Sequence, residues 1–304
     1  MKRGVWYAAG AYVLWGVLPL YWKMLPQVPA LEILAHRMLW SLAFVLLLTA
    51  LRRHWRALRA ALRSRRTVLL SVLSALLLSI NWWLYIWAVN AGFVVETSLG
   101  YFINPLVNVL LGVVVLRERL RPWQALALAL AVAGVSWLTI SYGALPWIAL
   151  TLALSFGLYG LLRKTTPLES LQGLTLETLA LSPAAVLYLL WLEGQGRGAF
   201  GHGGLGTTLL LIGAGVVTAV PLLLFAAGAR RITMITLGIL QYIAPTLQFL
   251  IGVLIYHEPL PRTRLLGFVL IWVALAIYTV DGAVRAGRAA RVYAAEVGAP
   301  LPRS

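Results

Sequence analysis

Residues 103–120 read INPLVNVLLGVVVLRERL, and residues 243–260 read IAPTLQFLIGVLIYHEPL. When the sequence is shifted against itself so that Ile103 lies over Ile243, the two stretches align and are identical at seven positions. Apolar residues match one another easily, so the informative identities are a proline, a glycine and a glutamate: Pro105/Pro245, Gly112/Gly252 and Glu118/Glu258. A weaker match, in a slightly different register, relates Trp15, Gly16 and Lys23 to Phe156, Gly157 and Lys164. The chain therefore contains an internal repeat.

Composition indicates that this repeat lies in a membrane. Of the 304 residues, 61% are apolar and 11% are charged, against about 45–50% and about 25% in soluble proteins, so a soluble fold is excluded. A spanning helix needs about 20 mostly apolar residues, and continuously apolar runs favour helices over barrel strands. Ten spans are predicted, at residues 4–25, 29–51, 67–90, 94–116, 122–140, 146–163, 168–192, 207–230, 233–256 and 261–280. The absence of cysteine excludes thiol chemistry and disulfides.

The basic residues predict the orientation. The net charge of +16 comes from 25 Lys and Arg against 9 Asp and Glu. With the N-terminus in the cytoplasm, 20 of these basic residues fall in inner connections and tails and 4 in outer ones, as the positive-inside rule requires. We therefore expect both termini on the cytoplasmic side of the inner cell membrane. The first span has no Ala-x-Ala-type cleavage site and is predicted to be retained.

Each copy of the repeat contains five spans. Because five is odd, the second copy enters the membrane from the opposite side, which predicts an all-α protein of two inverted five-helix repeats. The predicted domains are residues 4–140 and 146–280, followed by a basic cytoplasmic tail at 281–304. Many secondary transporters have this architecture and bind substrate near the midplane, between the repeats.

The fourth and ninth spans carry matching polar stripes. Residues spaced three and four apart share one helix face, and a proline near the middle of each span is predicted to bend the helix beside protein or a water-filled cavity. The alternative is that small residues and amides only hold helices together. The first stripe is Ser98, Tyr101, Pro105, Asn108 and Gly112, and the second is Gly238, Gln241, Pro245, Gln248 and Gly252.

Ionisable residues inside spans are candidates for function because placing them there is costly. Glu32, His36 and Arg37 lie near the outer end of the second span, and Glu96 opens the fourth span on the same side. Their cluster is interpreted as a proton or substrate gate. The alternative is an ion pair that ties the second span to the fourth.

Glu177 lies in the inner half of the seventh span and is the inner candidate for coupling. Lys164, Arg230 or Arg231 are expected to approach it. A purely structural salt bridge is the alternative interpretation.

Amides and aromatic rings within the spans predict the solute. They suit a neutral or zwitterionic organic molecule with a flat apolar part better than an inorganic ion. The predicted solute contacts are Asn81, Tyr85, Tyr101, Asn104, Asn108, Tyr159, Gln241, Tyr242 and Gln248.

Two further features are expected to be structural. Glu118 and Glu258 precede Pro122 and Pro261 and are predicted to cap those helix starts. The arginine-rich stretch 52–66 is predicted to be amphipathic and to lie on anionic lipid of the inner leaflet.

Six strings rich in Trp, Asn and Pro carry a family resemblance: AHRMLWS (35–41), NWWLYIWAVN (81–90), ETSLGYFINPLVN (96–108), SFGLYGLLRK (155–164), QYIAPTL (241–247) and residues 268–278. They resemble the RarD group of the EamA family, within the drug/metabolite transporter superfamily. The resemblance implies ten helices, two EamA repeats and a permease or exporter of small organic molecules.

The sequence thus predicts a secondary transporter of a drug-like or metabolite-like solute, either chloramphenicol-like or amino-acid-like, working by alternating access. No ATP-binding loop or metal motif is found, so we expect no cofactor, no metal, no catalytic residue and no nucleic-acid partner. A membrane-embedded enzyme acting on lipid or a sugar carrier and a passive channel are the alternatives. Proton coupling and a homodimer are left open.

Overall fold

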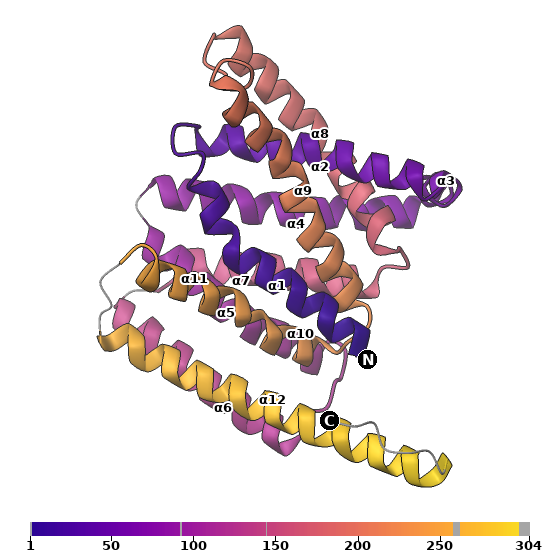
Figure 1. The fold of residues 1–304 in the computed structure, drawn as a ribbon, viewed down its shortest axis with the longest axis vertical. Coiled ribbons are helices and arrows are strands. Elements are labelled where there is room, and N and C mark those ends of the chain that lie inside the picture. The colour runs from indigo at the N-terminus through magenta and orange to yellow at the C-terminus, as the bar shows by residue number, and fades with distance from the viewer. Residues whose placement is uncertain (1, 92, 144, 258–261, 298–304) are drawn as a thin grey trace. The chain divides into compact units, whose positions relative to one another are not determined.

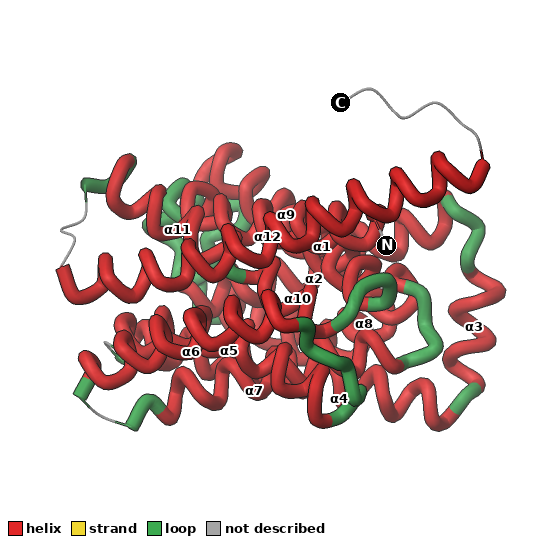
Figure 2. Tube along the Cα trace, turned by 90° about the horizontal axis from the view of Figure 1, so that it is seen from below, coloured by secondary structure: helices red, strands yellow, loops and turns green. Residues whose placement is uncertain are grey.

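The computed structural model describes residues 2–91, 93–143, 145–257 and 262–297. Within these ranges the chain forms helices joined by loops, and no strand occurs (Figures 1 and 2). The helices are α1 (Lys2–Trp22), α2 (Ala30–Leu51), α3 (Trp55–Arg63), α4 (Arg65–Asn90), α5 (Val94–Val114), α6 (Pro122–Tyr142), α7 (Trp147–Thr165), α8 (Ser170–Gly194), α9 (Gly204–Ala229), α10 (Met234–Gln241), α11 (Ile243–Leu254) and α12 (Arg262–Val297).

In the described part of the chain, eight helical stretches are long and apolar enough to cross a membrane, with α10 and α11 counted together. The predicted all-α membrane fold is therefore confirmed. The two remaining predicted spans correspond to α1 and α7, helices of 21 and 19 residues. Both bury tyrosines completely, Tyr12 and Tyr159, among other helices. The count of ten spans stays a prediction.

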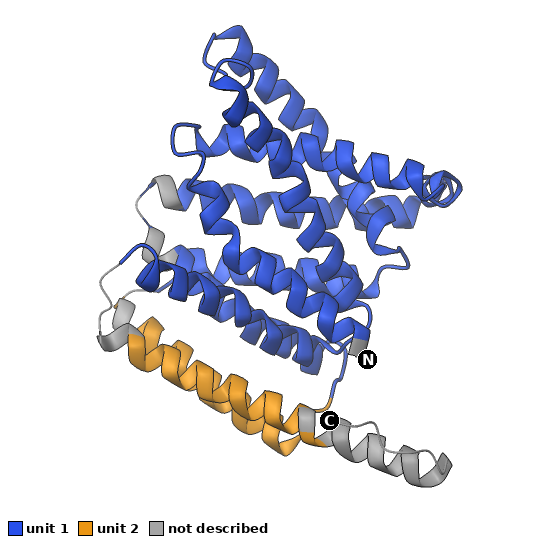
Figure 3. Ribbon diagram, viewed as in Figure 1, with its two compact units in different colours: residues 1–118, 145–259 blue, residues 119–144, 260–304 orange. Residues whose placement is uncertain are grey.

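The two sequence halves interleave within the first of two compact units, residues 1–118 and 145–259 (Figure 3). The repeat relates α1 to α7, α2 to α8, α4 to α9, and α5 to α10 with α11. Apart from α3, which packs on α8, the contacts between halves in this unit come in matching pairs: α5 packs on α7 as α1 packs on α10 and α11, α2 packs on α9 as α4 packs on α8, and α1 packs on α9 as α4 packs on α7. Two further pairs, α2 with α8 and α5 with α10, join equivalent helices directly. This exchange is what a two-fold relation between the halves produces.

The second compact unit contains α6 and α12, the last helix of each half. The helices approach closely because Gly134 lies against the backbone of Gly267, and a Cβ atom there would be 2.9 Å from the Gly267 carbonyl oxygen. Small residues at helix interfaces in membranes allow such approach. Arg121 and Asp281 also join the two helices, 3.7 Å apart. The helix α12 continues past residue 280, the predicted end of the tenth span, to Val297, and its apolar stretch of membrane-spanning length is Leu265–Gly282.

The helix is interrupted near one of the two predicted bends, at Pro245, and continuous through the other, at Pro105. In the second half, α10 ends at Gln241 and α11 begins at Ile243, so the helix is interrupted just before the proline. Tyr242 at the break is 1% exposed, which fits the rule that irregular backbone at membrane depth is covered by protein. In the first half, α5 runs through Pro105 as one helix.

The arginine-rich stretch forms the short amphipathic helix α3. Leu58 and Ala61 on its apolar face are buried in a cluster with Leu168 and Leu176, just before and within α8. Because protein covers this face, the predicted contact with anionic lipid concerns only the face that carries arginines.

Glu118 caps a helix, but not the one predicted. Its two carboxylate oxygens accept hydrogen bonds from the backbone nitrogens of Met234 (2.8 Å) and Ile235 (3.0 Å), at the start of α10 in the other half. A Cβ atom on Gly112 would be 2.8 Å from the same carboxylate. The repeated glycine and glutamate therefore belong together, since the glycine leaves room for the capping side chain. Glu258 lies outside the described residues.

Candidate functional site

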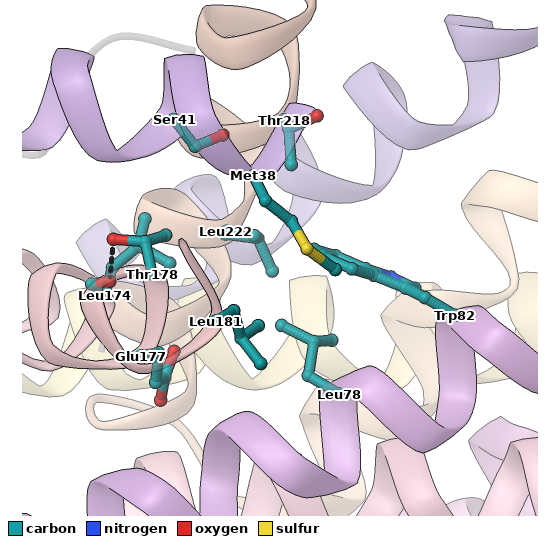
Figure 4. A pocket seen from close by; sticks show the side chains of 10 residues that line it. All are labelled: Met38, Ser41, Leu78, Trp82, Leu174, Glu177, Thr178, Leu181, Thr218 and Leu222. Atoms are coloured by element: carbon teal, nitrogen blue, oxygen red, sulfur yellow. Dashed lines mark hydrogen bonds between the residues drawn. The ribbon is translucent and has the colours of Figure 1, made fainter. Parts of the chain in front are cut away.

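A small cavity lies between α2, α4, α8 and α9, with room for about one water-sized molecule. The side chains of Met38, Leu78, Leu181 and Leu222 point toward one another in Figure 4, with the ring of Trp82 at one edge. Eight of the ten lining residues form four pairs in the register that places Pro105 over Pro245: Met38/Thr178, Ser41/Leu181, Leu78/Thr218 and Trp82/Leu222. The cavity is thus centred on the two-fold relation between the halves, and Leu174 and Glu177 complete it.

Arg37 lies beside this cavity and contacts two of its walls. Its Nε donates a hydrogen bond to Oγ1 of Thr218 on α9, 2.9 Å away. The guanidinium carbon is 4.8 Å from the ring centre of Trp22, at the end of α1, and 5.0 Å from that of Trp82 on α4. Three helices besides its own therefore position this cation.

Two tyrosines extend the aromatic surroundings of Arg37. Tyr85 on α4 and Tyr101 on α5 pack edge to face, with ring centres 5.9 Å apart. Both are close enough to the guanidinium to interact with it electrostatically, and both remain 37% exposed. Tyr85 and Tyr101, two of the predicted solute contacts, are therefore brought together beside Arg37.

Glu177 is buried and fully paired. Its carboxylate accepts hydrogen bonds from Ser74 (2.6 Å), Arg163 (3.3 Å) and Tyr159 (3.3 Å). Arg163 is 4% exposed and also donates to the Ser170 carbonyl oxygen. A buried ion pair with additional hydrogen bonds is the arrangement in which the two charges compensate each other. The role of Glu177 in coupling stays a prediction.

The expected partners of Glu177 were wrong, because the neighbouring cations bind backbone instead. Lys164 donates to the carbonyl oxygens of Ala229 and Ile232, at the end of α9. Arg230 donates to the carbonyl oxygen of Leu168, and Arg231 to that of Ala227. The last carbonyl groups of a helix have no partner within the helix and can accept hydrogen bonds from nearby cations. These carbonyl groups compete with the buried Glu177 carboxylate for the cations.

The outer polar cluster is only partly brought together. Nε2 of His36 is 3.9 Å from Oε1 of Glu32, as the spacing predicted, and the imidazole stacks on Phe200. Glu32 also accepts a 2.7 Å hydrogen bond from the backbone nitrogen of Ala199. The contact therefore ties α2 to the segment after α8, not to the fourth span. The side chain of Glu96 lies outside the described residues.

The predicted polar stripes meet each other across the halves. Asn108 donates to Oε1 of Gln241 (2.6 Å), and the Tyr242 hydroxyl donates to the carbonyl oxygen of Phe102 (3.3 Å). Phe102 and Tyr242 are equivalent in the repeat, so matching positions of the two halves touch. These groups bond within the protein, and their role as solute contacts stays a prediction.

The other predicted solute contacts are spread over unit 1. Asn81 donates to the Leu152 carbonyl oxygen (2.8 Å) and to Ser155 (3.0 Å), which ties α4 to α7. Gln248 donates to the carbonyl oxygen of Trp15, 3.2 Å away. Asn104 is 5% exposed, and its side-chain oxygen has no partner among the described residues. None of the nine predicted contacts lines the cavity of Figure 4.

Sequence reasoning missed Trp22 and Thr218. A tryptophan near the end of a span is common at the membrane interface, and a threonine in a helix often bonds its own backbone, so neither is conspicuous. The repeat could have identified Thr218. It is equivalent to Leu78, and a threonine where the other half has a leucine indicates that a polar atom is used at that position. Within the described residues no group of three or more metal-ligating side chains is found.

An all-helical membrane protein whose two halves interleave around an enclosed cavity has the architecture of a transporter. The model of the EamA-like transporter family matches residues 2–140 and 145–280. The chain belongs to this family.

Proteins similar to this chain include one named as a transporter and two named RarD. The chain is 50% identical over 281 residues to the uncharacterized transporter YojE of Bacillus subtilis, covering 91% of this chain and 94% of that protein. It is 50% identical over 291 residues to protein RarD of Streptomyces exfoliatus, covering 95% and 92%. The chloramphenicol-sensitive protein RarD of Pseudomonas aeruginosa is 36% identical over 288 residues, covering 92% and 95%. A solved crystal structure with 21% identity matches with a TM-score of 0.70 over 92% of this chain and 98% of its own; this likeness concerns the fold alone.

Proposed function

We propose that the protein is a secondary transporter that moves a small organic molecule by alternating access, with the solute bound in and beside the cavity between α2, α4, α8 and α9. The observation that carries the proposal is the position of the cavity. Four repeat-related pairs of residues line it, and inverted-repeat transporters bind substrate where their repeats meet. Opening toward either side then needs only a change in how these four helices pack.

In this proposal some polar side chains bind the solute, and others hold the helices together. Tyr85 and Tyr101, which are each 37% exposed, and Arg37, whose only hydrogen bond within the described residues is from Nε, contact solute. The bonded pair Asn108 and Gln241 holds the halves together. The distribution of basic residues supports an orientation with both termini in the cytoplasm.

Counterflow in proteoliposomes tests the proposal. Vesicles containing the purified protein are loaded with unlabelled phenylalanine or chloramphenicol, and uptake of the labelled compound is followed. We expect transient accumulation above equilibrium that depends on the loaded compound. Uptake that is independent of the internal compound indicates a channel, and uptake equal to that of empty vesicles for both compounds and for a wider amino-acid panel contradicts the proposal.

A matched pair of variants on α8 assigns the flux to the cavity. Leu181→Trp places a large ring in the cavity wall, whereas Leu187→Trp adds the same ring at a position that is 69% exposed. We expect counterflow to be lost in Leu181→Trp and retained in Leu187→Trp. Equal counterflow in both would place the solute elsewhere.

A further inference from the structure

We propose that the solute of this transporter is a planar organic anion whose carboxylate is bound by Arg37, between Trp22 and Trp82. The inference rests on the proposed function and names the substrate class of that site. It starts from the hydrogen bonding of the guanidinium. Arginine has five N–H donors, and the described structure uses only Nε, toward Thr218.

The two Nη nitrogens of Arg37 remain available to a ligand. No carboxylate among the described residues forms an ion pair with Arg37. Some buried side-chain nitrogen and oxygen atoms have no hydrogen-bond partner and no contact with solvent, and the two Nη nitrogens of Arg37 are not among them. These donors therefore face accessible space, with the geometry that binds a carboxylate through two parallel hydrogen bonds.

The position equivalent to Arg37 in the second half also carries a charge, and there the charge is neutralised by a partner of opposite sign. Arg37 is equivalent to Glu177 in the register that places Pro105 over Pro245. Trp22 is equivalent to Arg163 in the register of the first helix pair, which places Lys23 over Lys164. In the second half, Arg163 and Glu177 form a buried ion pair at 3.3 Å. In the first half, the same contact joins a cation to a tryptophan, so this half lacks the anion that its counterpart contains.

Contacts with the two tryptophans do not replace that anion. A ring face attracts a guanidinium by about 0.5–2 kcal/mol, but a neutral ring does not cancel the positive charge of the side chain. Neither ring accepts a hydrogen bond from the Nη edge of the guanidinium. A bound anion would supply the missing charge at this edge.

The surroundings favour a ligand with a flat apolar part. Trp82 contacts the guanidinium and also lines the cavity. Tyr85 and Tyr101 lie on the partly exposed side, with their rings edge to face. Aromatic rings stack on such surfaces at offset or perpendicular angles. An aromatic or conjugated carboxylate, or an amino acid with an aromatic side chain, combines both features.

Binding of matched carboxylates and amides tests the proposal without relying on transport. The probes are cinnamate and cinnamamide, benzoate and benzamide, and indole-3-acetate and indole-3-acetamide, measured by thermal shift and calorimetry on purified protein. We expect at least one carboxylate to bind about 10- to 100-fold more tightly than its amide. Equal binding within every pair, or no binding of any carboxylate, overturns the proposal.

Variants assign the selectivity to this arginine. We expect Arg37→Met to remove the preference for the carboxylate and Arg37→Lys to retain part of it. The control is Arg231→Met, which removes another ring-contacting arginine, over Tyr7, from an exposed position. Carboxylate preference that persists in Arg37→Met contradicts the assignment. Counterflow without carboxylate preference would refute this inference and leave the proposed function standing.

Discussion

Arg37 and Glu177 occupy the same place in the two halves of the molecule, but their charges are satisfied differently. Each contacts a residue from the first helix of its own half, Trp22 or Arg163. Each also forms a hydrogen bond with the other half. Arg37 donates to Thr218 on α9, and Glu177 accepts from Ser74 on α4. The geometry is repeated, while the balance of charge is not.

This contrast shows how two equivalent positions in a repeat can satisfy their charges in different ways. Glu177 is 1% exposed and has three side-chain partners. Arg37 has one hydrogen bond and two ring contacts. We infer that the second half uses this position for stability and the first half uses it for recognition.

The largest expected effect follows removal of Arg163. Arg163→Met leaves the Glu177 carboxylate buried without its cation, and we expect the free energy of unfolding to fall by about 3–5 kcal/mol, measured by denaturant unfolding in detergent. The double variant Arg163→Met/Glu177→Gln should recover most of this loss. Arg37→Met should lower stability much less, because it leaves no buried carboxylate. Equal losses for Arg37→Met and Arg163→Met would show that both arginines are structural.

A smaller effect is expected when α2 and α9 are forced apart. In Gly215→Ala on α9, the new Cβ would lie 2.3 Å from the Trp40 carbonyl carbon and 2.6 Å from the Ser41 nitrogen, which are backbone atoms of α2. We expect a loss of about 1–3 kcal/mol and weaker carboxylate binding, because Thr218 would move away from Arg37. Gly206→Ala in the same helix is the control, since nothing lies within 4 Å of its added Cβ. Unchanged binding in a destabilised Gly215→Ala would separate Thr218 from recognition.

The smallest effects concern the single hydroxyls on the two charges. Ser74→Ala removes a 2.6 Å hydrogen bond to Glu177, and Thr218→Val removes a 2.9 Å hydrogen bond from Arg37. We expect each to lower the free energy of unfolding by about 0.5–2 kcal/mol, with only Thr218→Val also weakening carboxylate binding. Thermal shift and calorimetry measure both quantities, and Thr218→Ser, which keeps the hydroxyl, should restore binding. Weaker binding in Ser74→Ala would remove the distinction between the two positions.

Much of the fold could be predicted because its signals are local. Apolar runs mark the helices, and the proline at 245 marks the interruption between α10 and α11. The arginines of 52–66 predicted an amphipathic helix, and α3 is one. These features depend on neighbours in the sequence, which a single chain displays directly.

The site was harder to predict because its contacts join distant residues. Glu118 was expected to cap the next helix, but its partners Met234 and Ile235 lie in the other half of the sequence. Asn108 and Gln241 were identified as polar, yet nothing in the sequence indicated that they would bond to each other. Arg37 was identified by its charge alone; its partners Trp22 and Thr218 are residue types that membrane helices commonly contain.

The cap that Glu118 places on α10 determines which parts of the protein can move together. The segment just after α5 is bonded to the start of α10 through Glu118, and Asn108 within α5 is bonded to Gln241, the last residue of α10. These two attachments lie at opposite ends of α10 and resist sliding and pivoting between α5 and α10. We therefore expect α5 and α10, one helix from each half, to move as one rigid unit. In the proposed alternating-access cycle, we therefore expect the mobile bodies to differ from the two halves of the sequence. We expect the other helices of unit 1 to move relative to the α5–α10 pair, so a crosslink between α5 and α10 should leave transport intact.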